Sequence, residues 1–242
     1  LISLIFSNST SALSFAIITW LLWTIFLPKL IGNFTQSLTP LSTRFELNEK
    51  MLEDRSKGID GHNPFDQRRK SLEKEVLVKY KVDSLPQLPV NFSGLLMQAD
   101  EEYGNEVWDK HYGELYRNLE TQKRNYQLSG LINPFASLQS LSMGSAGTDL
   151  FHHIDFLNEA EVYRRYFIKT LNDEYAFGGC KTGERGWKAT NEFFRSVKDF
   201  SYKEVSFFGV FYKYLIDILC LIFWTISLIF LIAYLSKKDL VI

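Results

Sequence analysis

Apolar residues are concentrated at the two ends of the chain, and nearly all charged residues lie between them. Residues 11–34 carry a single charge, Lys29, and residues 211–235 carry two, Lys213 and Asp217. A helix of about 20 apolar residues crosses a bilayer core of roughly 30 Å. We therefore predict a transmembrane helix over each of these two ranges.

The residues that flank the second apolar helix predict its orientation. Lys237 and Lys238 follow it directly, and basic residues at the end of a membrane helix favour the cytoplasmic side. We expect residues 236–242 to form a cytoplasmic tail. Two crossings return the chain to the side on which it started, so residues 35–206 are expected to form an extracytoplasmic domain.

The first residues form a further, shorter apolar stretch. Residues 1–6 lack the basic start and the small-residue cleavage site of a signal peptide. We expect them to be the end of a preceding transmembrane helix. A polar run, Ser7 to Thr10, follows, and Ser9 or Thr10 is expected to cap the helix at 11–34.

The segment between the apolar ends has the periodicity of helices rather than strands. We expect helices over 41–56, from a cap at Asn63 with Pro64 to about 81, over 93–129, from Asn133-Pro134 onward, and from a cap at Thr148 or Asp149 to about 175. The predicted fold is all-α. Two transmembrane helices flank a mostly helical extracytoplasmic domain, in which a long helical hairpin carries shorter helices.

Composition narrows the function classes. Lys and Arg total 27 and Asp and Glu total 28, so no basic surface points to nucleic acid as a partner. Cys180 lies in a polar loop and Cys220 in the second apolar run, so we expect no disulfide between them. No Cys-x-x-Cys pair is present, which removes support for a thiolate zinc site.

The densest polar cluster lies at the start of the last predicted helix of the domain. On a helix, Asp149 shares a face with His152 and His153, as a pair of metal ligands would. Glu159 lies too far along to complete the site, whereas Asp149 is well placed to cap the helix. We therefore predict a capped helix start and no metal or cofactor.

A catalytic site finds no support in the sequence. Ser142, Ser145, the two histidines and Asp155 contain the residue types of a nucleophile triad, but no nucleophile elbow or preceding strand is present. The phosphate-binding pattern Gly-x-x-x-x-Gly-Lys-Ser/Thr is also missing. We expect no catalytic residue and no enzymatic activity in this chain.

Other polar motifs have simple interpretations. Glu161 with Arg164 and Arg165 has the spacing of a solvated helix face. Three acceptor patterns for N-glycosylation begin at Asn8, Asn33 and Asn91, and they matter only in a eukaryotic secretory pathway.

Asp217 stands inside an apolar run, where a carboxylate is a functional candidate. It also lies one turn from the membrane interface, four residues after Lys213. We expect a solvated interfacial ion pair between these two side chains.

Small residues cluster at 142–147 and can allow close approach of helix backbones. Behind the predicted cap at Asp149, the side chains of Leu150, Ile154, Leu157 and Val162 form an apolar stripe. We therefore expect residues 133–172 to be the architectural centre of the domain rather than a catalytic site.

The same region carries a family resemblance. Its pattern consists of the run Ile132 to Met143, then Ala146 to Asp149, His152-His153, Phe156, Glu159 to Glu161, Tyr163 to Arg165 and Leu171-Asn172. It resembles bacterial ABC-2 type permeases, in the subgroup with a large extracytoplasmic domain of unassigned function before the last transmembrane helix. The order of elements along nearly the whole chain is also similar, but the glycine-rich loop at 178–187 departs from the family pattern.

The resemblance implies a transport function. Such permeases have several transmembrane helices and work with a separate cytoplasmic ATPase, and this chain would be the C-terminal part of one subunit in the bacterial inner membrane. The implied partners are the ATPase, a second permease subunit in a homo- or heterodimer, the lipid bilayer and an envelope protein. Two alternatives remain: a membrane receptor or sensor whose outer domain binds a ligand, and a domain that docks an envelope protein.

Overall fold

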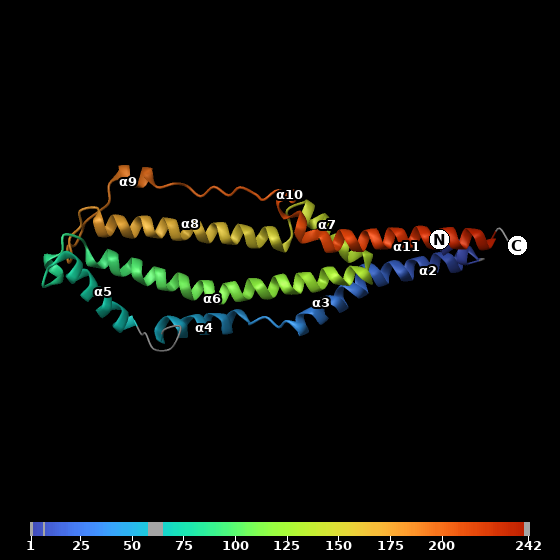
Figure 1. Cartoon of the computed structure of the whole chain (residues 1–242), viewed down its shortest axis with the longest axis horizontal. Helices are drawn as coiled ribbons and strands as arrows, with labels where there is room; N and C mark the ends of the chain where they lie inside the picture. Colours follow the sequence, from blue (N-terminus) through green and yellow to red (C-terminus); the bar gives the residue numbers. More distant parts are fainter. Residues whose placement is uncertain (1, 7, 58–64, 240–242) are drawn as a thin grey trace. The chain divides into compact units, whose positions relative to one another are not determined.

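The computed structural model describes residues 2–6, 8–57 and 65–239, and in these ranges it contains helices and no strand. The prediction of an all-α fold is confirmed. The expected cap at Asn63-Pro64 lies outside the described residues. In chain order the elements in Figure 1 are α1 (Ile2–Ile5), α2 (Ser9–Leu21), η1 (Leu22–Phe26), α3 (Leu27–Leu38), α4 (Arg44–Lys57), α5 (Phe65–Tyr80), η2 (Leu85–Gln87), α6 (Phe92–Leu128), η3 (Ser129–Leu131), α7 (Pro134–Ser145), α8 (Leu150–Phe177), α9 (Asn191–Ser196), α10 (Phe207–Val210), η4 (Phe211–Tyr214) and α11 (Leu215–Asp239).

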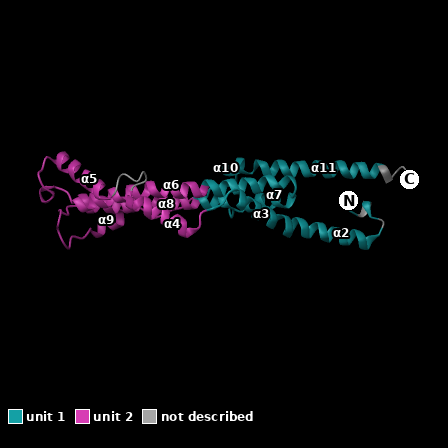
Figure 2. Cartoon of the chain, turned by 90° about the horizontal axis from the view of Figure 1, so that it is seen from below, with its two compact units in different colours: residues 1–41, 117–155, 204–242 teal, residues 42–116, 156–203 magenta. Residues whose placement is uncertain are grey.

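The chain divides into two compact units (Figure 2). Unit 1 consists of residues 1–41, 117–155 and 204–242, and unit 2 consists of residues 42–116 and 156–203. Residues 117–155 thus fold together with the two apolar ends of the chain, a grouping that the sequence pattern did not predict.

In unit 1, two helical runs are long and apolar enough to cross a membrane: Ser9–Leu38, made of α2, η1 and α3, and Phe207–Lys237, made of α10, η4 and most of α11. No residue in the most apolar window of the first run is buried. The side chain of Asn8 caps α2 by accepting a hydrogen bond of 3.0 Å from the backbone N–H of Thr10. The expectation that Ser9 or Thr10 is the cap was wrong.

The first apolar run contains a widened turn in its middle. Pro28 has no N–H and cannot donate to the carbonyl of Thr24, as an α-helix would require. The preceding segment, η1, is a π-helix, in which the N–H of Leu27 donates to the carbonyl of Leu22, five residues earlier. The turn before Pro28 is therefore a π-turn.

In unit 2, α6 and α8 lie side by side and antiparallel, which agrees with the predicted helical hairpin. The amide of Asn172 donates to Gln98 over 3.1 Å. One turn further along, Gly94 lies against the backbone of α8, where an added Cβ would be 2.6 Å from the nitrogen of Ala176. Glycine at position 94 is thus what lets the two helices approach so closely.

A small apolar core lies around the start of α6 in unit 2. Its buried side chains are Val76, Leu88, Val90 and Phe92, with Leu72, Leu77 and Tyr80 packed around them. They come from α5, from the segment after η2 and from the first residue of α6. The core therefore fixes α5 against the start of the long helix α6.

The glycine-rich loop after α8 folds back onto the start of α6. Gly179, Gly183 and Gly186 have φ values of +93°, +84° and +87°, which favour glycine. The loop places Cys180, which is 1% exposed, under Asn91, whose amide nitrogen lies 3.1 Å from the Cys180 sulfur. Both cysteines of the chain are free thiols.

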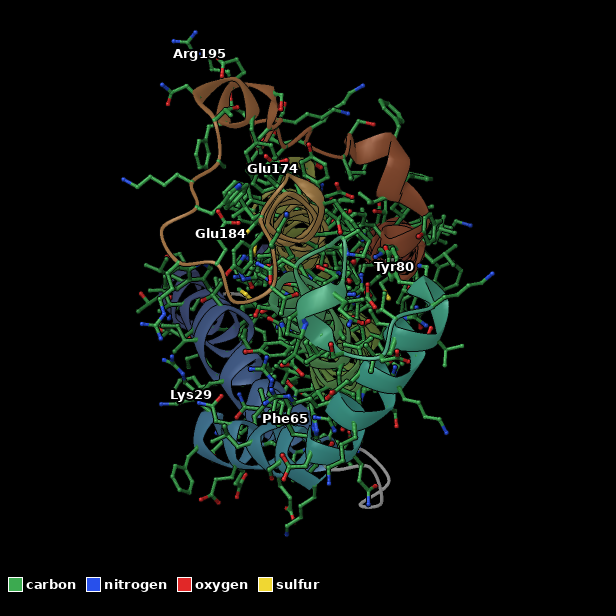
Figure 3. The ribbon with its side chains drawn as sticks, turned by 90° about the vertical axis from the view of Figure 1, so that its left-hand side faces the viewer. Lys29, Phe65, Tyr80, Glu174, Glu184 and Arg195 are labelled. Atoms are coloured by element: carbon green, nitrogen blue, oxygen red, sulfur yellow. The ribbon has the colours of Figure 1, made fainter. Side chains whose placement is uncertain are left out.

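Beyond this loop, Thr190 caps the short helix α9, and its hydroxyl accepts from the N–H of Phe193 over 3.2 Å. On α9, the exposed side chain of Arg195 points outward (Figure 3).

Candidate functional site

The candidate site lies in unit 1, where the end of α6, η3 and α7 form a helical hairpin. The hairpin contains no Asp, Glu, Lys or Arg from Asn125 to Thr148. Its turn is bonded to both long apolar helices. The amide nitrogen of Asn133 donates to the carbonyl of Trp23 over 3.0 Å, and the indole N–H of Trp224 donates to the carbonyl of Gly130 over 2.9 Å.

Small residues allow the hairpin to pack closely against α11. An added Cβ at Gly130 would lie 3.2 Å from the sulfur of Cys220, and one at Gly144 would collide with the ring of Tyr214. Trp23 and Trp224 also meet edge to face, with 5.5 Å between ring centroids. Of the small residues singled out in the sequence, Gly144 is buried, and its predicted role in close packing is supported.

At the head of α11, the carboxylate of Asp217 is fully buried. Its Oδ2 accepts hydrogen bonds from the amide nitrogen of Gln127 (2.6 Å) and from the hydroxyl of Ser140 (2.8 Å). These three side chains come from α11, α6 and α7. A buried charge is tolerated only where it is paired and hydrogen-bonded, so this carboxylate holds the three helices together.

The hydroxyl of Ser140 also contacts a positively charged side chain, that of Lys123. The ammonium of Lys123 donates to the Ser140 hydroxyl over 2.8 Å, and this hydroxyl donates in turn to Asp217. Burial lowers the pKa of Lys123, whereas the carboxylates of Asp149 and Asp217 oppose that shift. Lys123 thus supplies the positive charge that balances the buried acid through one bridging serine. We refer to Lys123, Gln127, Ser140 and Asp217 as the polar clamp.

Some buried oxygens in the polar clamp, and that of the neighbouring Ser137, have no hydrogen-bond partner in the described part of the chain. Among the described residues, no hydrogen bond reaches Oδ1 of Asp217, Oε1 of Gln127 or the hydroxyl oxygen of Ser137. All three side chains have relative exposures of 0%. Unpaired buried oxygens cost free energy.

A second buried acid, Asp149, lies at the start of α8. It caps this helix by accepting from the backbone N–H of His152 (3.2 Å), and the same oxygen lies 2.7 Å from Nδ1 of His152. Its other oxygen accepts from the hydroxyl of Tyr214 over 2.8 Å. Burial would raise the pKa of Asp149, but the bonds from His152 and Tyr214 outweigh it and hold this pKa below its ordinary value.

The predicted cap at Asp149 is therefore present, and the other residues of that cluster have different positions. His152 is buried and pairs with Asp149, whereas His153 is exposed. In the described part of the chain, no three His, Cys, Asp or Glu side chains come together as metal ligands. Ser142 and Ser145 are exposed, and the hydroxyl of Ser145 donates to the carbonyl of Leu141 over 2.8 Å.

The apolar stripe expected behind this cap is present in part. Ile154 is buried and Leu150 and Leu157 are partly buried, but Val162 is 60% exposed. Val162 was wrongly included because, at about 100° per residue, it lies roughly 120° around the helix from Leu150 and roughly 140° from Leu157, away from the stripe.

The expectation for Asp217 was also wrong. It is neither solvated nor paired with Lys213, whose ammonium instead lies 3.5 Å from Glu120 and over the ring of Phe151. The partners of Asp217 are Gln127 and Ser140, 90 and 77 residues away in the sequence. Residues 125–148 carry no charge and include Gln127 and Ser140. This uncharged run was the feature of the sequence from which partners of Asp217 in this segment could have been predicted.

A third expectation, that Glu161, Arg164 and Arg165 form a solvated face, was wrong as well. In unit 2 the side chain of Glu161 is only 10% exposed and accepts hydrogen bonds from both arginines. Arg164 also reaches Glu101, and Arg165 reaches Asp109, both on α6. Burial opposes ionisation of Glu161, but the arginine hydrogen bonds hold its pKa below the usual value. This network ties α8 to α6.

Comparison with known proteins identifies one matching family model. Residues 44–203 match the model described as "Domain of unknown function (DUF3526)". The matched range includes the hairpin and ends before α10 and α11. No match was found among curated proteins or among solved structures.

The polar clamp predicts which side chains are energetically coupled to Asp217. In a double-mutant cycle of Asp217→Leu with Gln127→Leu, we expect a coupling energy of roughly 0.5–3 kcal/mol, because each single change leaves a buried polar group unpaired. The matched cycle with Lys213→Met should give a coupling energy close to zero. Both are measured by denaturation in detergent micelles. If the coupling energy between Asp217 and Lys213 were as large as that between Asp217 and Gln127, the expected ion pair of Asp217 with Lys213 would be correct after all.

The lowered pKa of Asp149 predicts an acid-sensitive contribution to stability. Because the folded-state pKa lies below the ordinary carboxyl value of about 3.9, the ionised group stabilises the fold above that pH, and its contribution is lost as the pH falls through the folded-state value. Asp149→Ala should lower the free energy of unfolding by roughly 0.5–2 kcal/mol at neutral pH.

Asp149→Asn is the matched control, since asparagine still caps a helix but carries no charge. The free energy of unfolding of this variant should be lower than that of the wild type at neutral pH, and the difference should shrink in acid. Unfolding in micelles is followed from neutral to acidic pH. A deficit that is constant over this range would show that the charge of Asp149 contributes nothing.

Proposed function

The chain belongs to the family described as Domain of unknown function (DUF3526), and from that premise we propose that it is the C-terminal part of a membrane-spanning ABC transporter permease. The helices Ser9–Leu38 and Phe207–Lys237 cross the membrane, and a separate ATPase subunit supplies the energy for transport. The resemblance of residues 132–172 to ABC-2 type permeases supports this assignment.

The observation that carries the proposal is the uncovered apolar surface of the two long helices. In α11, Ile226, Ile229 and Phe230 are 62%, 63% and 73% exposed. Side chains of this kind lose roughly 1.5–3 kcal/mol each when they remain in water rather than in an apolar environment. At about 1.5 Å per residue, both runs exceed the roughly 30 Å core of a bilayer. Lipid is the surrounding that such helices require.

The polar clamp favours a transport subunit over a simple anchor. A helix that only tethers a domain has no use for a carboxylate near its outer end, and an ionisable side chain in an apolar helix is a marker of function. Asp217 joins α11 to α6 and α7, so a change in one of these helices reaches the others. Coupled helices of this kind suit a protein that changes conformation as it transports its substrate.

The remaining parts of the proposal concern orientation and partners. Lys237 and Lys238 favour a cytoplasmic C-terminus, and this supports an extracytoplasmic position for unit 2 at the bacterial inner membrane. The separate ATPase chain is what the resemblance to ABC-2 type permeases implies. A second permease subunit completes the transporter, and unit 2 is available to an envelope protein.

Copurification tests the transport assignment. The protein is tagged, extracted from its native membranes in a mild detergent, purified, and assayed for ATP hydrolysis. We expect hydrolysis, together with a second polypeptide that contains a phosphate-binding loop, and we expect it to disappear when the lysine of that loop is replaced. The chain purified without partners should hydrolyse no ATP. Hydrolysis by the chain alone, or a preparation without any ATPase, would contradict the proposal.

Thiol labelling tests the orientation. In a background with Cys180→Ala and Cys220→Ala, single cysteines are introduced at Glu114 in unit 2 and at Ser236 in the last turn of α11, both of which are exposed. In intact cells, a membrane-impermeant maleimide should label the first and not the second, whereas both should react after permeabilisation. The opposite pattern in intact cells would reverse the proposed topology.

A further inference from the structure

The carboxyl group of Asp217 uses only one of its two oxygens for hydrogen bonds within the described residues. Oδ2 accepts from the amide of Gln127 over 2.6 Å and from the hydroxyl of Ser140 over 2.8 Å. In the part of the chain that the structure describes, no hydrogen bond reaches the buried Oδ1. An ionised carboxylate has acceptor oxygens only, and each is costly to bury without a donor. Oδ1 is therefore the oxygen that can hold a proton without displacing a donor.

The hydroxyl of Ser137, on α7, lies next to this carboxyl group. It is close to Asp217 and to the thiol of Cys220. It is also covered by η3, because an added Cβ at Gly130 would collide with it. Its oxygen is buried and, like Oδ1, has no hydrogen-bond partner among the described residues. A proton on Oδ1 gives the carboxyl group a donor that this neighbouring oxygen can accept, which satisfies both groups.

The buried charges around the polar clamp do not balance when every group has its ordinary charge. Asp149 and Asp217 are 2% and 0% exposed, and the ammonium of Lys123 acts on both of their carboxylates. The ammonium of Lys213 is paired with Glu120 instead, over 3.5 Å. Two buried carboxylates thus share one cation. A buried acid that lacks a cation takes up a proton rather than remain charged.

Of the two acids, Asp149 is the one whose contacts suit a negative charge. Its two oxygens have separate partners, His152 and Tyr214, and a neutral His152 ring with its proton on Nδ1 is sufficient for the first contact. Asp217 has donors on one oxygen alone. Three other titratable groups near Asp217 are ordinarily uncharged at neutral pH, namely those of Tyr126, Tyr214 and Cys220. The added proton is therefore expected on Asp217.

From these observations we propose that Asp217 is a proton-binding site. The proton is held on Oδ1 and donated to the hydroxyl of Ser137, while Gln127 and Ser140 continue to donate to Oδ2. In this state Lys123 balances Asp149, and when the proton leaves, Lys123 has to balance both acids. The leftover negative charge then favours a rearrangement that lets water reach Asp217. The packing of α6, α7 and α11 thus depends on proton uptake at this site.

Infrared spectroscopy of the full chain in detergent tests the proposal. The C=O stretch of a protonated carboxyl group is separate from the bands of carboxylate groups. We expect this band at neutral pH in the difference spectrum of the wild type minus Asp217→Asn, and not in that of the wild type minus Asp149→Asn. Ser137→Ala should shift the band to higher frequency, because the carboxyl O–H loses its acceptor. Ser142→Ala, a change at an exposed serine of the same helix, should leave it in place.

Stability gives a second measurement on the same chain. Asparagine at position 217 has nearly the shape of the protonated acid and no charge, so Asp217→Asn should unfold in micelles at nearly the same denaturant concentration as the wild type at neutral pH. Asp217→Leu cannot accept from Gln127 and Ser140 and should unfold at a lower concentration.

Two results would show that Asp217 is ionised and binds no proton. One is a difference spectrum for Asp217→Asn that contains carboxylate bands alone, which a proton held by His152 would also give. The other is an Asp217→Asn chain that is as unstable as Asp217→Leu. Both measurements use the chain without partners, so their outcome is separate from that of the copurification test.

Discussion

The packing of unit 1 depends on hydrogen bonds that offset the cost of burying one carboxylate, that of Asp217. Asp217 is fully buried in an apolar helix, and removing a carboxylate from water without partners costs far more than the stability of a typical domain can supply. Gln127, Ser140 and, through the serine, Lys123 provide that compensation. Because these partners come from α6 and α7, the carboxylate specifies how the hairpin packs on α11. Apolar contacts alone would leave several rotations of these helices nearly equal in energy.

The cost of burying the carboxylate of Asp149 is offset by hydrogen bonds from groups both near to it and far from it in the sequence. Two of its bonds come from His152, three residues later in the same helix, and one comes from Tyr214. Gly144 leaves the space that the Tyr214 ring occupies. Both networks thus involve the short segment Tyr214 to Asp217: Tyr214 donates to Asp149, and Asp217 accepts from α6 and α7. This arrangement fixes the point at which the chain enters its last apolar helix.

Features set by neighbouring residues could be predicted from the sequence, whereas contacts between residues far apart in the chain could not. Helix positions and the caps at Asp149 and Asn133 follow from residues a few positions apart, and they could be predicted from pattern and spacing. Both apolar helices were equally clear from composition. The partners of Asp217 were not, because Lys213 was the nearest candidate in the sequence while Gln127 is 90 residues away. Glu161 was misjudged for the same reason, since Glu101 and Asp109 complete its network from another helix.

The loop that buries Cys180 has a consequence for redox chemistry. If unit 2 lies on the oxidising side of the membrane, as proposed, an unpaired exposed thiol there forms mixed disulfides with other proteins. Cys180 is 1% exposed beneath Asn91, so the folded loop shelters the thiol from oxidants without a second cysteine. Alkylation of this thiol requires the loop at 178–186 to open. The rate at which Cys180 reacts is therefore a built-in measure of how often that part of unit 2 unfolds.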